Sequence, residues 1–153
     1  MIVRRAEPAD VPALAEFQDI PSANLPAFTD WMSAHSRTHL AFVADVNGQV
    51  AGAAWLLIAE RVPRTTTAPR RHGDIQSVMV REPFRNQGIG TALIAAIQTE
   101  ARTRSLSHVT VHSGRRAVDF YLRNGFTHHR QLLLWEPRTP SADENLTSTR
   151  EHR

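Results

Sequence analysis

Two helices are expected near the start of the chain, because apolar residues recur there every three or four positions. The first begins after Asp10, which can cap it, and the second begins near Pro26. The apolar side is formed by Val11, Leu14 and Phe17 in the first helix, and by Phe28, Trp31, Met32 and His35 in the second.

Strands are expected where the apolar residues become continuous, at residues 2–6, 40–46 and 49–60. Asn47-Gly48 separates the last two and can adopt the two positive φ angles of a type I′ turn, so a β-hairpin is predicted there. The polar residues 61–73 then form a connection longer than the usual hairpin loop of about 2–5 residues. A connection of this length is a candidate lid.

An apolar strand at residues 75–80 precedes a glycine-rich loop at 85–90 and a helix. The helix repeats an apolar residue every four positions, which gives it one side for packing on a sheet. Gly88 and Gly90 let backbone N–H groups approach a ligand, and the first turn of a helix has unpaired N–H groups and a partial positive charge. This arrangement predicts a cradle for the diphosphate of a bound cofactor.

A further strand and helix are expected downstream of this cradle. Residues 108–112 are expected to form a short strand, and Ser113 can cap a helix over residues 115–124. Gly125 stands where a glycine commonly ends a helix.

The end of the chain divides into a last strand and a polar tail. Strand character returns at Phe126, and the apolar residues 132–135 are expected to form the final strand, which could pair across a homodimer. Beyond Pro137 the sequence is rich in Thr, Ser, Pro and charge, so we expect disorder. The prediction is a single domain over residues 1–136 and a disordered tail over 137–153.

The composition fits one soluble globular domain. Of 153 residues, 41% are hydrophobic and 22% are charged. The absence of cysteine excludes disulfides, thiolate catalysis and cysteine-bound metal. Neither a signal peptide nor a run of the ~20 apolar residues that cross a bilayer is visible, so we expect a cytoplasmic protein without a membrane partner.

Charge gives little reason to expect a nucleic-acid partner. All 18 residues counted as Lys+Arg are arginine and the formal net charge is only +3, so a small excess of guanidinium groups produces the sequence pI of about 10.8. A nucleic-acid binder remains a rival interpretation, and its affinity would fall steeply with salt. No metal is expected either, because adjacent histidines such as His128-His129 point to opposite faces of a strand.

Two motifs follow each other in the second half of the chain. Residues 78–93 read Val-Met-Val-Arg-Glu-Pro-Phe-Arg-Asn-Gln-Gly-Ile-Gly-Thr-Ala-Leu, and residues 117–126 read Ala-Val-Asp-Phe-Tyr-Leu-Arg-Asn-Gly-Phe. They resemble the strand-loop signature R/Q-x-x-G-x-G/A and the "A..FY...GF" element of the GNAT N-acetyltransferase superfamily. The element order over residues 1–136 is similar to that of the family as well.

This resemblance implies an α/β (α+β) fold in which a mixed, mostly antiparallel sheet of about six to seven strands is flanked by about four helices. Acetyl-CoA would lie between splayed central strands as cosubstrate, with its diphosphate on the glycine loop and its pantetheine arm paired like an extra strand with Val78 and Val80. The implied cofactor-binding residues are Val78, Met79, Val80, Arg85, Asn86, Gln87, Gly88, Ile89, Gly90, Thr91 and Tyr121.

The implied reaction is acetyl transfer to a primary amine of a small molecule or peptide, by direct attack in a ternary complex. Alkyl amines are mostly protonated at neutral pH, so a base must accept a proton. Asp74 and Gln76 lie at two positions where branches of the family carry an acidic residue, and of the two only Asp74 can be a base. His112 is a second candidate, because imidazole suits proton transfer near neutral pH.

Two further catalytic roles come from the resemblance. Tyr121, the only tyrosine, sits where the family places the residue that protonates the departing thiolate; a core aromatic is the alternative. The backbone N–H of Val78 would meet the oxyanion.

The acceptor side is less defined. The implied substrate-binding residues are Phe28, Trp31, Gln76 and His112, although core packing explains Phe28 and Trp31 as well. The arginines of residues 61–73 suggest an acidic acceptor. In a different class, a catalytically inactive acyl-CoA-binding regulatory module is the rival interpretation.

Overall fold

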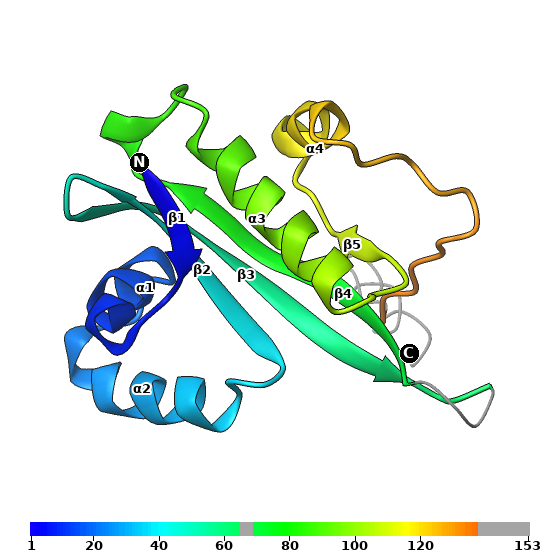
Figure 1. The fold of residues 1–153 in the computed structure, drawn as a ribbon, viewed down its shortest axis with the longest axis horizontal. Coiled ribbons are helices and arrows are strands. Elements are labelled where there is room, and N and C mark those ends of the chain that lie inside the picture. The colour runs from blue at the N-terminus through cyan, green and yellow to red at the C-terminus, as the bar shows by residue number, and fades with distance from the viewer. Residues whose placement is uncertain (65–68, 138–153) are drawn as a thin grey trace, which may run out of the picture.

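A computed structural model describes residues 1–64 and 69–137 (Figure 1). The elements in chain order are β1 (Ile2–Arg5), α1 (Val11–Phe17), α2 (Leu25–Ala34), β2 (His39–Val46), β3 (Gln49–Arg61), β4 (Arg70–Val80), α3 (Ile89–Thr103), β5 (Val109–Val111) and α4 (Val118–Arg123). Residues 65–68 of the expected lid and residues 138–153 of the expected disordered tail lie outside the described ranges.

The five strands form one sheet in chain order, β1-β2-β3-β4-β5. The first four are antiparallel neighbours, while β4 and β5 are parallel. The expected hairpin joins β2 and β3, with φ of 53° at Asn47 and 81° at Gly48. β3 and β4 are longer than expected and pair out to Arg61 and Arg70, which shortens the expected 61–73 connection.

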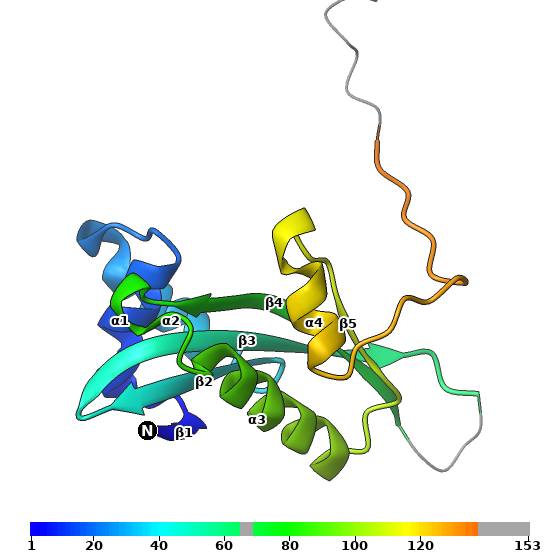
Figure 2. The same cartoon turned by 90° about the horizontal axis from the view of Figure 1, so that it is seen from above.

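Strands β4 and β5 stay together over three residues only. Gly73, Asp74 and Ile75 pair with Val109, Thr110 and Val111, after which the chain leaves β5 and turns into α4. β4 continues to Val80 alone on this side, as Figures 1 and 2 show. A pair of splayed strands was expected, and β4 and β5 are that pair: they separate after Ile75 and Val111.

Helices cover both faces of the sheet (Figure 2). On one face α3 buries Ile89, Leu93, Ile94 and Ile97 against a core that includes Leu56 and Ile75. On the other face α1 and α2 enclose a smaller core around Leu14, Val43 and Trp55. The alternation of side chains along β2 and β3 supplies both cores, because successive residues of a strand point to opposite faces.

The expectation of six to seven strands is wrong for the described residues, which contain five. The missing strand is the one predicted after Phe126: residues 126–137 have no strand, and Leu132, Leu133, Leu134 and Trp135 are between 65% and 87% exposed. Apolar and β-branched residues favour strands only where a neighbouring edge pairs with them. Here the segment runs away from β5 instead (Figure 2).

Two predicted helix caps are also corrected. Asp10 precedes α1, but its side chain makes no cap bond; it pairs with Arg4 at 2.6 Å and accepts the Glu7 N–H at 2.7 Å. The reason is that a 3-10 turn, Pro8–Asp10, leads directly into α1, so the chain is capped earlier, at Glu7. Ser113 does not cap a helix: its hydroxyl donates to Gly114 O. A 3-10 turn, Arg115–Ala117, leads into α4, and its N-cap residue is Gly114.

Candidate active site

The glycine loop ends in a backbone conformation that requires glycine. Gly88 has φ of 79° and stands at the N-terminus of α3, and an added Cβ would point into open space. Residues Ile89 to Thr91 form the first helical turn, so their N–H groups have no intrahelical acceptor. Arg85, Asn86 and Gln87 are exposed beside them. The loop can therefore hold an anion such as a diphosphate on backbone N–H groups and the positive end of the helix dipole.

Gly90 connects this loop to the second sequence motif. A Cβ at Gly90 would lie 3.1 Å from two ring atoms of Phe120 in α4, a tighter approach than side chains normally make. The absence of a side chain at Gly90 lets α4 pack against the start of α3. Residues about thirty positions apart in sequence are thereby fixed relative to each other.

The free side of β4 presents backbone groups for pairing. Arg81 N–H donates to Ala51 O at 2.8 Å, and Met79 O lies on the β3 side as well, close to Gly52. Because backbone groups alternate along an antiparallel strand, those of Val78 and Val80 point the other way, toward the opening between β4 and β5. The Arg85 Nε–H donates to Val80 O there at 3.4 Å. The valine side chains pack on the α3 core.

A β-bulge shapes β4 just before this free edge. Trp55 pairs with Ser77 and Leu56 with Ile75, so Gln76 is the extra residue. Gln76 lies on the same side as Asp74, as their spacing predicts, and its Nε2 donates to Asp74 Oδ2. Thr110 Oγ1 donates to the other carboxylate oxygen at 2.6 Å. The Asp74 carboxylate is thus held in place by Gln76 of its own strand, β4, and by Thr110 of the neighbouring strand, β5.

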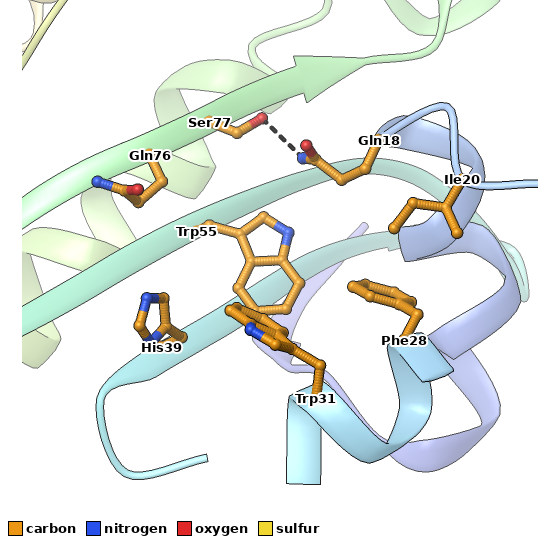
Figure 3. Close-up of a pocket in the computed structure, with 8 residues that line it drawn as sticks. All are labelled: Gln18, Ile20, Phe28, Trp31, His39, Trp55, Gln76 and Ser77. Atoms are coloured by element: carbon orange, nitrogen blue, oxygen red, sulfur yellow. Dashed lines mark hydrogen bonds between the residues drawn. The ribbon is translucent and has the colours of Figure 1, made fainter. Parts of the chain in front are cut away.

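A pocket of about 460 Å³ opens on the α1/α2 face beside the bulge (Figure 3). Three of the four expected substrate-binding residues line it: Phe28, Trp31 and Gln76. The other lining residues are Gln18, Ile20, His39, Trp55 and Ser77. Gln18 Nε2 donates to Ser77 Oγ at 3.2 Å and so links the end of α1 to β4. Asp74, Tyr121 and His112 are not part of its lining.

Aromatic rings form most of the pocket wall. The Trp31 ring centroid lies 6.3 Å from Phe28, 6.0 Å from Trp55 and 5.0 Å from His39. Trp55 is only 6% exposed, and its Nε1–H is buried without a hydrogen-bond partner in the described part of the chain. Trp31, by contrast, is 39% exposed at the rim, so it is not the core residue that α-helical periodicity alone would suggest.

Tyr121 lies on the opposite face, in the α3 core beside Phe120 and Phe126. It is 9% exposed, and no hydrogen bond of its hydroxyl is found among the described residues. Burial raises the pKa of the phenol above its ordinary value of 10.0, so the hydroxyl keeps its proton at neutral pH. His112 follows β5 directly and is exposed.

Sequence reasoning missed Gln18, Ile20, His39, Trp55 and Ser77. Gln18 and Ile20 follow α1 in an irregular segment that offers no periodic pattern. Trp55 lies on β3 opposite Ser77 of the recognised strand, and this register between β3 and β4 was not predicted from the sequence. His39 precedes the expected strand start by one residue and becomes the first residue of β2.

The structure gives two negative findings for its described residues. No group of three or more His, Asp or Glu side chains is placed to hold a metal ion. No helix is long and apolar enough to cross a membrane.

Comparison with known proteins agrees with this geometry. A Trypanosoma brucei brucei protein named glucosamine 6-phosphate N-acetyltransferase is 32% identical over 94 residues, which are 61% of this chain and 62% of that protein. The chain thus matches less than two thirds of the length of this relative. Among solved structures, a putative acetyltransferase from Agrobacterium tumefaciens has a TM-score of 0.74 and 26% identity over 90% of this chain and 100% of that one.

A third comparison concerns the fold alone. A predicted acetyltransferase from Clostridium acetobutylicum, solved with acetyl-CoA, has a TM-score of 0.70 and 19% identity over 88% of this chain and 95% of that chain. The sequence model of the acetyltransferase (GNAT) family matches residues 6–126, which contain the glycine loop, the free edge of β4 and the pocket. This chain therefore belongs to the GNAT acetyltransferase family.

Proposed function

We propose that this protein transfers the acetyl group of acetyl-CoA to a primary amine of a small molecule or peptide, by direct attack in a ternary complex. One observation carries the proposal: the free edge of β4 at Val78–Val80 connects the glycine loop to the bulge that borders the pocket. A cofactor with a diphosphate and an amide-bearing arm fits this path. Family membership and the acetyl-CoA in the Clostridium acetobutylicum neighbour support the choice of cofactor.

The loop and strand would hold the cofactor at both ends. The diphosphate would accept hydrogen bonds from the N–H groups of residues 88–91, with Arg85, Asn86 and Gln87 beside it. The arm would pair with the outward backbone groups of Val78 and Val80, with Met79 between them. No Cβ occupies the space above Gly88. Acetyl-CoA supplies an activated acetyl group, a thioester whose sulfur leaves with the bonding electron pair.

The chain's own groups then handle charge and protons. In the direct-attack mechanism the amine nitrogen bonds to the acetyl carbon while the carbon–sulfur bond breaks. Val78 N–H, which points to the free edge, would donate to the developing oxyanion. Tyr121, kept protonated by burial, would give its proton to the thiolate. A thiol has an ordinary pKa of ~8.5, so this leaving group needs only modest help.

Asp74 is the proposed acceptor of the amine proton. It lies two residues from Gln76, which lines the pocket and donates to the carboxylate. A water between the amine and Asp74 would complete the route, while Gln76 and Thr110 keep the carboxylate oriented. His112 is the second candidate base; Asp74 is the better choice because Gln76, a pocket-lining residue, donates a hydrogen bond to it, and no such contact is found for His112 among the described residues.

The test combines binding with turnover. Calorimetry should detect acetyl-CoA binding, and free thiol should be released when a panel of primary amines is added, with the acetylated amine identified by mass spectrometry. Binding of acetyl-CoA without acetylation of any amine would overturn the enzyme proposal and favour the rival, an inactive acyl-CoA-binding regulatory module.

We further propose that the folded unit of residues 1–136 forms a homodimer in the cytoplasm. The exposed Leu132–Trp135 segment and the outer edge of β5, which has no strand partner in the described residues, occur on the same chain. Two copies could therefore pair segment to edge reciprocally, as a closed twofold interface requires. Leu133→Asp should convert a dimer into a monomer in light scattering, and a monomeric wild type would refute this assembly.

A further inference from the structure

The pocket beside β4 carries no formal charge. None of its eight lining residues is Asp, Glu or Arg. His39 is the one lining residue with a group that titrates near neutral pH, and desolvation, with a smaller contribution from His35, lowers its pKa below the ordinary 6.5. The imidazole is therefore neutral at pH 7. An occupant finds no counter-ion on these walls.

The walls suit a flat apolar group. Trp31 and Trp55 meet at an interplanar angle of 65°, and Phe28 stacks beside Trp31 at 10°. Rings arranged in this way accept a further aromatic ring by edge or face contact. Figure 3 shows these side chains on one side of the cavity and the polar groups of Gln18, Gln76 and Ser77 along β4. The polar end of the pocket is thus the end nearest the free edge of β4.

Neither a phosphate nor a polycation finds its usual partner here. Phosphate recognition normally uses guanidinium groups. Arg70 and Arg71, two of the arginines expected to favour an acidic acceptor, donate instead to Val62 O and Arg104 O. A polycation would need carboxylates, yet Glu16, near the end of α1, pairs with Arg81 at 2.7 Å. The wall therefore differs from what a sugar phosphate or an aminoglycoside requires.

We propose that the acceptor is an arylalkylamine, an amine joined by a short chain to an aromatic ring that packs against Trp31 and Trp55. This inference rests on the proposed acetyltransferase function and names its substrate class. A volume of about 460 Å³ accommodates a ring and a short chain, with the amine toward Gln76 and Ser77. The same ring could belong to a free amine or to a peptide with N-terminal phenylalanine.

The experiment compares acceptors that differ only in the feature at issue. Steady-state kcat/KM is measured with 2-phenylethylamine, ethylamine, glucosamine 6-phosphate and a phenylalanyl dipeptide at saturating acetyl-CoA. The expected result is at least a tenfold advantage of 2-phenylethylamine over both ethylamine and glucosamine 6-phosphate. The dipeptide arm distinguishes a free amine from a peptide terminus as the source of the ring.

Two tryptophan variants locate the effect. Trp31→Ala should remove most of the advantage, by about tenfold and through KM. Trp31 is 39% exposed, so the substitution leaves the core intact. Trp135→Ala is the matched control, because Trp135 is 83% exposed and outside the pocket. It should keep the wild-type preference.

The outcomes separate this inference from the proposed function. Glucosamine 6-phosphate turned over as well as 2-phenylethylamine, or a ring preference unchanged by Trp31→Ala, would overturn the inference while the enzyme proposal stood. If acetyl-CoA bound but no amine were acetylated, the enzyme proposal would fall. Calorimetry of 2-phenylethylamine with coenzyme A present would then decide: binding lost in Trp31→Ala supports the ring site, and no binding overturns it.

Discussion

The cofactor side and the acceptor side of this protein are built in different ways. The glycine loop, with Gly88 and Gly90, lies within one short stretch that runs from the end of β4 into the first turn of α3. The pocket takes its residues from the segment that follows α1 and from α2, β2, β3 and β4, and few of them are neighbours in sequence. A site made from one segment can be recognised by its motif. A site assembled from five elements depends on the whole fold and can change its chemistry without changing the motif.

The largest expected effect tests the loop. Gly88→Ala places a Cβ at φ of 79°, in the space where the diphosphate would lie, so acetyl-CoA affinity should fall about 100-fold, or about 2.7 kcal/mol. Calorimetry measures it. Gly48→Ala is a matched control, because Gly48 has φ of 81° and equally open surroundings in the β2–β3 turn. If both variants weakened binding equally, general strain rather than the cradle would be responsible.

The next effect tests whether the α4 motif contributes chemistry. Tyr121→Phe should lower kcat about 30-fold and leave acetyl-CoA affinity unchanged, since a proton donor is lost without a change of shape. No hydrogen bond of its hydroxyl is lost among the described residues, so thermal stability should change little. Wild-type kcat in this variant would make Tyr121 a packing residue only.

A third effect should reach the pocket but not the loop. Asp10 ties Arg4 of β1 to the start of α1, whose far end carries Gln18 and Ile20. Asp10→Asn should cost about 2 kcal/mol of unfolding free energy and raise the KM for the ring-bearing amine, with acetyl-CoA affinity unchanged. Urea denaturation and kinetics measure these. A loss of acetyl-CoA affinity instead would mean that the two sides are not independent.

The ion pair between Arg4 and Asp10 also predicts a pH dependence of stability. The hydrogen bond from Arg4 holds the pKa of Asp10 below its ordinary 3.8. The contribution is therefore complete above that value and disappears as the pH falls from there through the lower folded pKa. In Asp10→Asn the difference from wild type should shrink over this acidic range.

The smallest expected effect is a change of stability with pH that comes from His39 in the uncharged pocket wall. Because burial lowers the pKa of His39, the unfolded chain binds a proton first as pH falls below 6.5, and stability should decline slightly from there. NMR titration should place the His39 pKa below 6.5. A value well above 6.5 would put a positive charge on the pocket wall at neutral pH and contradict the uncharged wall from which the arylalkylamine acceptor is inferred.

The loop, the hairpin and the helices could be predicted because their signals are local. Asn47-Gly48 sets a turn, and the four-residue repeat after Ile89 sets a helix face, without help from distant residues. The last strand could not be predicted correctly, since residues 132–135 carry strand propensity but no information on whether an edge is available to pair with. Trp55 and His39 enter the pocket through sheet register, which a single sequence does not reveal.

Amide hydrogen exchange along β4, read by NMR with and without saturating acetyl-CoA, tests the central claim most directly. The account predicts slower exchange at the outward amides of Val78 and Val80 and little change at Met79, which faces β3. Unchanged exchange at Val78 and Val80 in the presence of bound acetyl-CoA would contradict a cofactor paired with this edge.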